Sequence, residues 1–246
     1  MLSIFKRTSR PPMDLRGLAC DMHSHLIPGI DDGSPDLETS IELIRGLAGL
    51  GYKKLITTPH INQDFFPNTP ENIGAGRTAV MAELRRQQLA VEFHAAAEYL
   101  LDDGFAGRLS AGEPLLTLTD KMVLIELSFA VPAMNIKDSI FELQLQGYQP
   151  VLAHPERYLY FAAAKGWYDQ LRDAGCLFQL NLLSFTGHYG REARDLAHYL
   201  VKKKYVEFLG TDLHHQGHLE IIRSSEAIFR AVQQLLDAGL IRNPTL

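Results

Sequence analysis

The sequence predicts an α/β fold with a parallel sheet. Short β-like runs alternate with longer helical patterns from residue 18 to the end of the 246-residue chain, and no linker-like stretch separates them. The composition is that of a globular protein, with 46% apolar and 22% charged residues. We therefore expect one domain over residues 18–246, preceded by a flexible N-terminal arm over residues 1–17.

The predicted strands are short apolar runs, most of them followed by a helical pattern. These strands cover residues 18–22, 54–58, 91–97, 122–127, 150–153, 177–180 and 206–209. The predicted helices cover residues 36–50, 70–88, 135–147, 166–174, 190–203 and 219–238. Gly51 fits a helix C-terminus and Pro70 a helix N-terminus, while residues 99–121 are less regular. Both a closed barrel and an open doubly wound sheet fit this order.

Charge and cysteine content exclude several functions. The net charge of −5 gives no basic footprint for nucleic acid or an anionic membrane. The sequence contains no apolar run long enough for a membrane span. Cys20 and Cys176 both lie in apolar runs and cannot form a disulfide framework. We expect a cytoplasmic protein.

Potential metal ligands follow nearly every predicted strand. They are His23, His25, Asp32, His60, Glu98, Glu126, His154, Asp212 and His214. In an extended strand, two residues at the spacing of His23 and His25 project to the same side. Nine such side chains exceed the coordination number of one ion, so two or three divalent ions are expected. The mixed ligands suit manganese, which we expect first, with iron or zinc as alternatives.

The same cluster suits a phosphate substrate. Three divalent ions would carry more positive charge than the four carboxylates neutralise, and Arg157 would add a planar donor fork that matches phosphoryl oxygens. A cysteine-based phosphatase is excluded, because its arginine would stand six residues after the cysteine. Leu26 and Leu182 occupy those positions. The glycine-rich phosphate loop of ATPases and GTPases is also absent.

In number, order and spacing, the motifs resemble the polymerase-and-histidinol-phosphatase (PHP) superfamily. Within it they resemble the bacterial tyrosine-protein phosphatases of capsule and exopolysaccharide synthesis. The resemblance covers residues 18–240. Its motifs are Asp21-Met-His-Ser-His25, Ile30-Asp-Asp-Gly33, Thr58-Pro-His60, Ala97-Glu-Tyr99, Ile125-Glu126, Ala153-His-Pro-Glu-Arg-Tyr158, Asn181-Leu-Leu-Ser184 and Gly210-Thr-Asp-Leu-His214. The resemblance implies a distorted seven-stranded (β/α) barrel of the PHP type.

The resemblance also implies how the ligands divide among the ions. One ion would take His23, His25, Glu98 and Asp212; a second would take Asp32, His60 and His214; a third would take Glu98, Glu126 and His154. Arg157 would hold the phosphate. Several relatives carry a second arginine where Leu219 stands here, and His215, His218 or Arg223 could replace it.

The implied activity is that of a metal-dependent phosphotyrosine-protein phosphatase, whose partner would be a bacterial tyrosine kinase that controls capsule synthesis. Phe65, Phe66 and Tyr158 could contact the substrate, although the two phenylalanines could equally anchor their loop in the core. The alternatives are a small-molecule phosphomonoesterase, such as a histidinol-phosphate phosphatase, and a non-catalytic regulatory module that binds metal.

Overall fold

The computed structural model describes residues 14–132 and 135–246. Most of the predicted arm, residues 1–13, lies outside these ranges. Residues 14–17 were also assigned to the arm. Of these, Leu15 is buried and its N–H donates to the carbonyl of Leu50 at 2.8 Å, whereas Arg16 and Gly17 are exposed. A single leucine beside polar residues carries no periodic pattern, so the sequence did not reveal this contact.

The described strands form two parallel sheets, which confirms the predicted α/β class. The smaller sheet has the order β1-β2-β4 and the larger the order β3-β5-β6-β7-β8-β9. The strands are β1 (Cys20–Asp21), β2 (Lys54–Thr57), β3 (His60–Ile61), β4 (Glu92–Ala95), β5 (Glu98–Leu100), β6 (Met122–Glu126), β7 (Gln149–Ala153), β8 (Leu177–Asn181) and β9 (Phe208–Gly210). The short strands β3 and β5 were not predicted: each follows a predicted strand, 54–58 or 91–97, after a two-residue break at the end of β2 or β4.

Hydrogen bonds join the two sheets where the strands end. Across the breaks, the N–H of Ala96 donates to the carbonyl of Thr57 at 2.8 Å, and the N–H of Glu98 donates to that of Pro59 at 3.1 Å. Between the ends of β1 and β9, the N–H of Asp212 donates to the carbonyl of His23 at 2.8 Å. Consequently the carboxyl ends of strands from both sheets lie close together.

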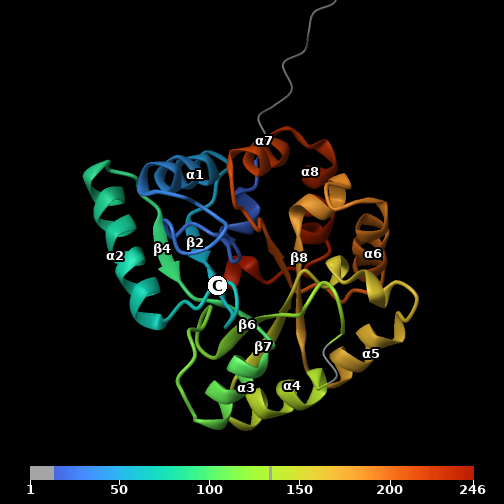
Figure 1. Cartoon of the computed structure of the whole chain (residues 1–246). Coiled ribbons are helices and arrows are strands. Elements are labelled where there is room, and N and C mark those ends of the chain that lie inside the picture. The colour runs from blue at the N-terminus through green and yellow to red at the C-terminus, as the bar shows by residue number, and fades with distance from the viewer. Residues whose placement is uncertain (1–13, 133–134) are drawn as a thin grey trace, which may run out of the picture.

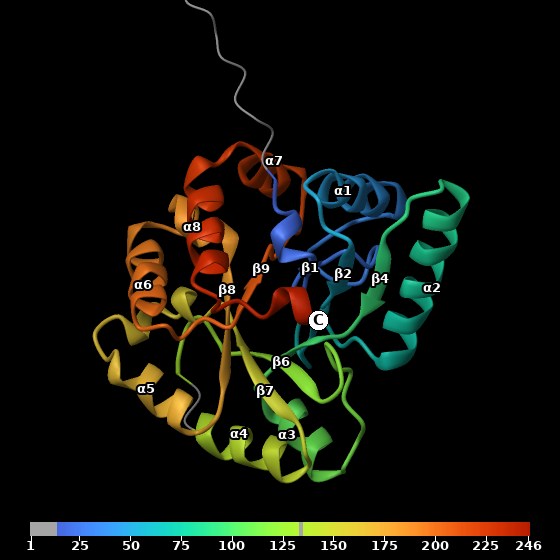
Figure 2. The same cartoon turned by 180° about the vertical axis from the view of Figure 1, so that it is seen from behind.

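Helices surround the strands (Figures 1 and 2). They are α1 (Leu37–Gly49), α2 (Pro70–Arg86), α3 (Asp103–Ser110), α4 (Ile136–Leu145), α5 (Gly166–Asp173), α6 (Arg191–Lys202), α7 (Gln216–Ser224) and α8 (Glu226–Asp237). Helix α3 was not predicted. The last predicted helix is divided into α7 and α8 at Ser225, whose side chain accepts a hydrogen bond from the N–H of Ile228 and so caps α8. None of the helices in the described ranges is long and apolar enough to cross a membrane.

The sequence explains the ends of the helices that border the site. Asp36 caps α1 by accepting a hydrogen bond from the N–H of Thr39, and α1 buries its apolar face through Ile41, Ile44 and Leu47. At α2, Thr69 and Asn72 form a reciprocal capping box, and Pro70 occupies the first turn as predicted. These helices pack on the strands and fix the loops that carry the polar residues.

Candidate metal centre

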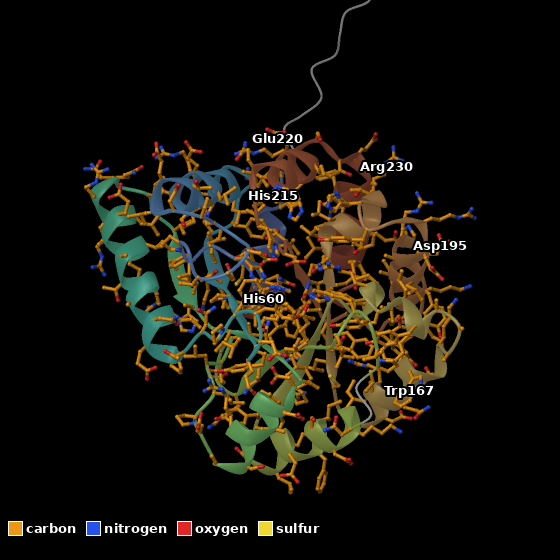
Figure 3. All side chains as sticks on the ribbon, in the orientation of Figure 1. His60, Trp167, Asp195, His215, Glu220 and Arg230 are labelled. Carbon is orange, nitrogen blue, oxygen red and sulfur yellow. The ribbon has the colours of Figure 1, made fainter. Side chains whose placement is uncertain are left out.

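The structure brings all nine predicted ligands together at the carboxyl ends of the strands. Their ligand atoms fall into four overlapping groups, and within each group these atoms lie within 4.8 Å of one another. The groups are His25/Asp32/His60/His214, His23/His25/Asp212, His23/Glu98/His154 and His60/Glu98/Glu126. Figure 3 shows His60 near the centre of the molecule, whereas Trp167 and Asp195 lie at its periphery.

His23 and His25 form the buried centre of the cluster. Their Nε2 atoms lie 3.4 Å apart, and both side chains are fully buried. Asp212 Oδ1 lies 3.4 Å from each Nε2 atom. Glu98 Oε2 lies 3.2 Å from Nε2 of His23 and 3.5 Å from Nε2 of His25. This is the first set that the resemblance implied for one ion.

Asp32 marks the open side of the cluster. Its Oδ1 atom lies 3.6 Å from Nε2 of His60 and 3.4 Å from Nε2 of His214, and its side chain is 57% exposed. The ring of His214 stacks on that of His25, with centroids 4.0 Å apart. His25 therefore belongs to this group as well as to the buried one, an overlap that the resemblance did not imply.

Glu98 connects the remaining ligands. Its Oε1 atom lies 3.0 Å from Nε2 of His154, and its Oε2 atom lies 3.2 Å from Nδ1 of His60. Glu126 approaches the same two histidines, at 3.7 Å from Nε2 of His154 and 3.4 Å from Nδ1 of His60. Glu98 thus lies between the buried pair and the group that contains Glu126, as expected for a bridging ligand.

The electrostatics of the cluster are those of buried imidazoles beside buried carboxylates. Burial alone would lower the pKa of His23, but Glu98 and Asp212 raise it to about 9. Burial likewise opposes ionisation of Glu98, yet His23 and His60 hold its pKa well below the ordinary value. His23 therefore holds a proton near neutral pH when no ion is bound, and a metal ion must displace it.

The residues fit divalent ions. Imidazole nitrogen and carboxylate oxygen are ligands that zinc, iron and manganese accept. Nδ1 of His60 is buried and has no hydrogen-bond partner, although two carboxylates lie within 3.4 Å of it. An unpaired buried nitrogen is costly unless something else occupies its lone pair. A cation between His60 and the two carboxylates would do so.

Two residues without a predicted role orient the central histidines. Asp31 Oδ2 lies 2.8 Å from Nδ1 of His25, and Gln179 Oε1 lies 2.7 Å from Nδ1 of His23. Such partners fix the ring orientation and direct Nε2 toward a metal. Asp31 belongs to a predicted motif, and its position beside the ligand Asp32 could have identified it from the sequence as part of the site. Nothing in the sequence distinguished Gln179 from other polar residues in strands.

Two of the ligands have unusual backbone conformations. His154 and Asp212 have φ values of 33° and 49°, in the left-handed region that residues with side chains rarely adopt. Such conformations persist where the surrounding structure enforces them, and they are concentrated at functional sites. Gly210 precedes Asp212 closely, and a Cβ atom at Gly210 would lie 2.7 Å from Cβ of His23. Only glycine allows this close approach.

Arg157 lies at the edge of the cluster. Its Nη1 atom donates to Oδ2 of Asp212 at 3.0 Å, and the side chain is 24% exposed. Together with most of the ligands it lines a cavity of about 310 Å³. His215 and His218 also line this cavity. Arg223 does not, because its Nη2 atom lies against Gly46 of α1.

The other predicted substrate contacts lie in different surroundings. Tyr158 is fully buried; its hydroxyl accepts from the N–H of Leu127 and donates to the carbonyl of Ala153. It cannot contact substrate, so this prediction is corrected. Phe66 stacks on His60, with centroids 5.4 Å apart. Phe65 is 78% exposed and does not line the cavity.

Comparisons with known proteins show which proteins this chain resembles. The family profile "Capsular polysaccharide synthesis, CpsB/CapC" matches residues 19–241. The tyrosine-protein phosphatase YwqE of Bacillus subtilis is 29% identical over 195 residues, which cover 79% of this chain and 76% of YwqE. The tyrosine-protein phosphatase CpsB of Streptococcus agalactiae is 28% identical over 204 residues, which cover 79% of this chain and 82% of CpsB.

A solved structure extends the similarity to three dimensions. It comes from work on YwqE from Bacillus subtilis and CpsB from Streptococcus pneumoniae, described as unique metal-dependent tyrosine phosphatases. The superposition has a TM-score of 0.75 at 26% sequence identity and covers 91% of this chain and 94% of the other.

Proposed function

Because the chain belongs to the CpsB/CapC family of capsular polysaccharide synthesis, we propose that its histidine and carboxylate cluster hydrolyses phosphotyrosine in proteins. It is a metal-dependent tyrosine-protein phosphatase, as its relatives YwqE and CpsB are named. The observation that carries this conclusion is the position of Arg157 in one cavity with the metal-ligating side chains. A phosphate held there meets the guanidinium and the cluster together.

We propose that the two sheets are parts of one distorted seven-stranded barrel of the PHP type, within one domain over residues 18–246. Strands β2 and β3 would share one position, and β4 and β5 another. The bridge between Ser24 and Leu213 supports closure, because it pairs the segments that follow β1 and β9. Closure explains why ligands from the first and last strands meet.

Two or three divalent ions would occupy the cluster, with manganese proposed first. His23, His25, Glu98 and Asp212 would hold one ion, and Asp32, His60 and His214 a second. Glu98, Glu126 and His154 would hold a third, so that two ions would share Glu98. Bound ions of this kind lower the pKa of water and neutralise charge on phosphoryl oxygens. The surplus of ligands over a single coordination sphere supports this number.

The residues of the chain supply binding and orientation. Arg157 places its donors at the phosphoryl oxygens, while Asp212 fixes one edge of the guanidinium. A tyrosine leaving group has a pKa of about 10, so it departs with less protonation than an alkoxide needs. The cysteines do not serve as nucleophiles: both are buried, and burial raises the pKa of Cys176 to about 12.

The partner would be a phosphotyrosine protein, and we propose a bacterial tyrosine kinase that controls capsule synthesis. The capsular family supports this choice. The cytoplasm is the proposed location, since both cysteines are free and buried and thiols persist in a reducing compartment.

Phosphate release from a phosphotyrosyl peptide tests the proposal. Manganese-loaded protein should hydrolyse the peptide with a higher kcat/KM than histidinol phosphate. The His25→Ala variant should lose turnover, because a buried ligand is removed. The control is His198→Ala, which changes an exposed histidine on α6. Preference for histidinol phosphate would favour the small-molecule phosphomonoesterase, and no turnover of either compound would favour the non-catalytic module.

A further inference from the structure

Phe129 is a large apolar side chain at the entrance of the candidate metal centre. It stands in the loop that follows β6, three residues after the ligand Glu126. Its side chain is 47% exposed, and it lines the same cavity as Arg157 and His154. An aromatic ring in this position stays partly in water unless a ligand covers it.

The protein holds this ring in a defined orientation. The guanidinium carbon of Arg157 lies 4.5 Å from the ring centroid of Phe129 and 4.3 Å from that of Tyr189. On its inner side, Phe129 packs with His154 and Tyr158, at centroid distances of 5.5 and 5.6 Å. The guanidinium of Arg157 therefore contacts two aromatic rings, and Phe129 packs on the buried rings of His154 and Tyr158.

The size of phosphotyrosine matches this arrangement. A phenyl ester places its ring one oxygen atom away from the phosphorus. If Arg157 binds the phosphoryl oxygens, the ring of the leaving group must lie within a few ångströms of the guanidinium. Phe129 already contacts the guanidinium, lines the cavity and is 47% exposed. Phosphoserine and phosphothreonine bring no ring to this place.

Among the phenylalanines near the site, Phe129 fits this role best. Phe65 is 78% exposed but does not line the cavity. Phe66 is stacked on His60, nearly parallel at 13° between the ring planes, and is also not a lining residue. The aromatic contact that was expected from residues 65 and 66 is thus better supplied by Phe129 in the loop after β6.

We propose that Phe129 is a specificity-determining residue that contacts the aromatic ring of the substrate while Arg157 binds its phosphate. The proposal rests on the proposed phosphotyrosine phosphatase function and assigns the residue that selects aryl over alkyl phosphates. Contact between two aromatic rings favours binding by about three- to tenfold, which sets the size of the expected selectivity.

Binding of unreactive phosphonates tests this assignment without turnover. Calorimetry would compare phenylphosphonate with methylphosphonate on manganese-loaded wild type, Phe129→Leu and Phe129→Tyr. We expect Phe129→Leu to lose about three- to tenfold in affinity for phenylphosphonate, with methylphosphonate changed less than about twofold. Phe129→Tyr keeps the ring and should retain the preference. The control is Phe141→Leu, which changes an exposed phenylalanine on α4.

Several results would overturn the assignment. If Phe129→Leu weakens both phosphonates equally, the ring only orders Arg157. If wild type shows no preference for phenylphosphonate, or the preference survives in Phe129→Leu, the substrate ring lies elsewhere. Metal content and thermal midpoint, measured on each variant, verify that the fold and cluster are intact. Turnover of a phosphotyrosyl peptide by wild type is measured in parallel. Its absence would refute the phosphatase function separately from the binding result.

Discussion

Replacement of Arg157 by alanine should lower kcat for a phosphotyrosyl peptide by about 30- to 1,000-fold, because a charge-assisted donor at a developing phosphoryl charge contributes about 2–4 kcal/mol. The structure favours the upper end. Arg157 is the one arginine or lysine among the described cavity-lining residues. His218 shares the cavity, but burial lowers its pKa to about 4, so it carries no charge near neutral pH. Arg157→Lys should rescue only in part, because an ammonium cannot stack on the rings of Phe129 and Tyr189 as a planar guanidinium can.

The assay is steady-state kinetics at equal metal occupancy, with Arg223→Ala as the matched control. Arg223 is exposed on α7 and does not line the cavity. We expect Arg157→Ala to lower kcat and not only to raise KM, because the arginine binds the phosphoryl oxygens more strongly in the transition state than in the ground state. Unchanged kinetics in Arg157→Ala would show that this arginine is structural. An equal loss in Arg223→Ala would show that the effect is not specific to the cavity.

Three further predictions concern the ions. Asp31→Ala should weaken metal binding by about 10- to 100-fold, because Asp31 orients His25. Equilibrium dialysis measures the affinity, and the control Asp64→Ala, which changes an exposed residue, should leave it unchanged. Equal affinities in the two variants would contradict an orienting role for Asp31. Metal affinity should rise between pH 6.5 and 9, by up to about tenfold per pH unit for each proton that the metal displaces. The pKa of His23, raised to about 9, keeps that histidine protonated and paired at lower pH; an affinity that stays flat in competition titrations would refute this. Finally, removal of ions whose free concentration is 100 times Kd should lower the free energy of unfolding by about 2.7 kcal/mol. Denaturant titration measures this loss, and an unchanged midpoint would contradict it.

The sequence predicted the parts of the fold that depend on local patterns. Apolar runs gave most strand positions, and residues such as Gly51 and Pro70 marked helix ends. Helix α3 was missed because its eight residues include two glycines and bury only Phe105 and Leu109. The break between β2 and β3 falls at Thr58 and Pro59, where the proline has no N–H for the sheet. No apolar pattern reports such a break.

The candidate site could be predicted because its polar residues follow successive strands. The residues that orient these ligands could not be predicted, because they are brought close only by the fold: Gln179 is 156 residues from His23. The same limit explains Tyr158, which was expected to contact the substrate. Its hydroxyl instead bonds to the backbone of Leu127 and Ala153 in the core. Tyr158 lies between two short 3₁₀ turns, Pro155–Arg157 and Leu159–Phe161, and its burial is set by packing and not by neighbouring residues in sequence.

The central claim is that phosphotyrosine hydrolysis depends on ions held by this cluster. The most direct test is phosphate release from a phosphotyrosyl peptide by chelator-treated protein as manganese is added back in measured equivalents. The account predicts negligible turnover without ions and a rise that saturates at two to three equivalents per chain. The Asp212→Ala variant should fail to recover at any equivalence while keeping its secondary structure. Full activity in the metal-free protein, or full recovery by Asp212→Ala, would contradict the account.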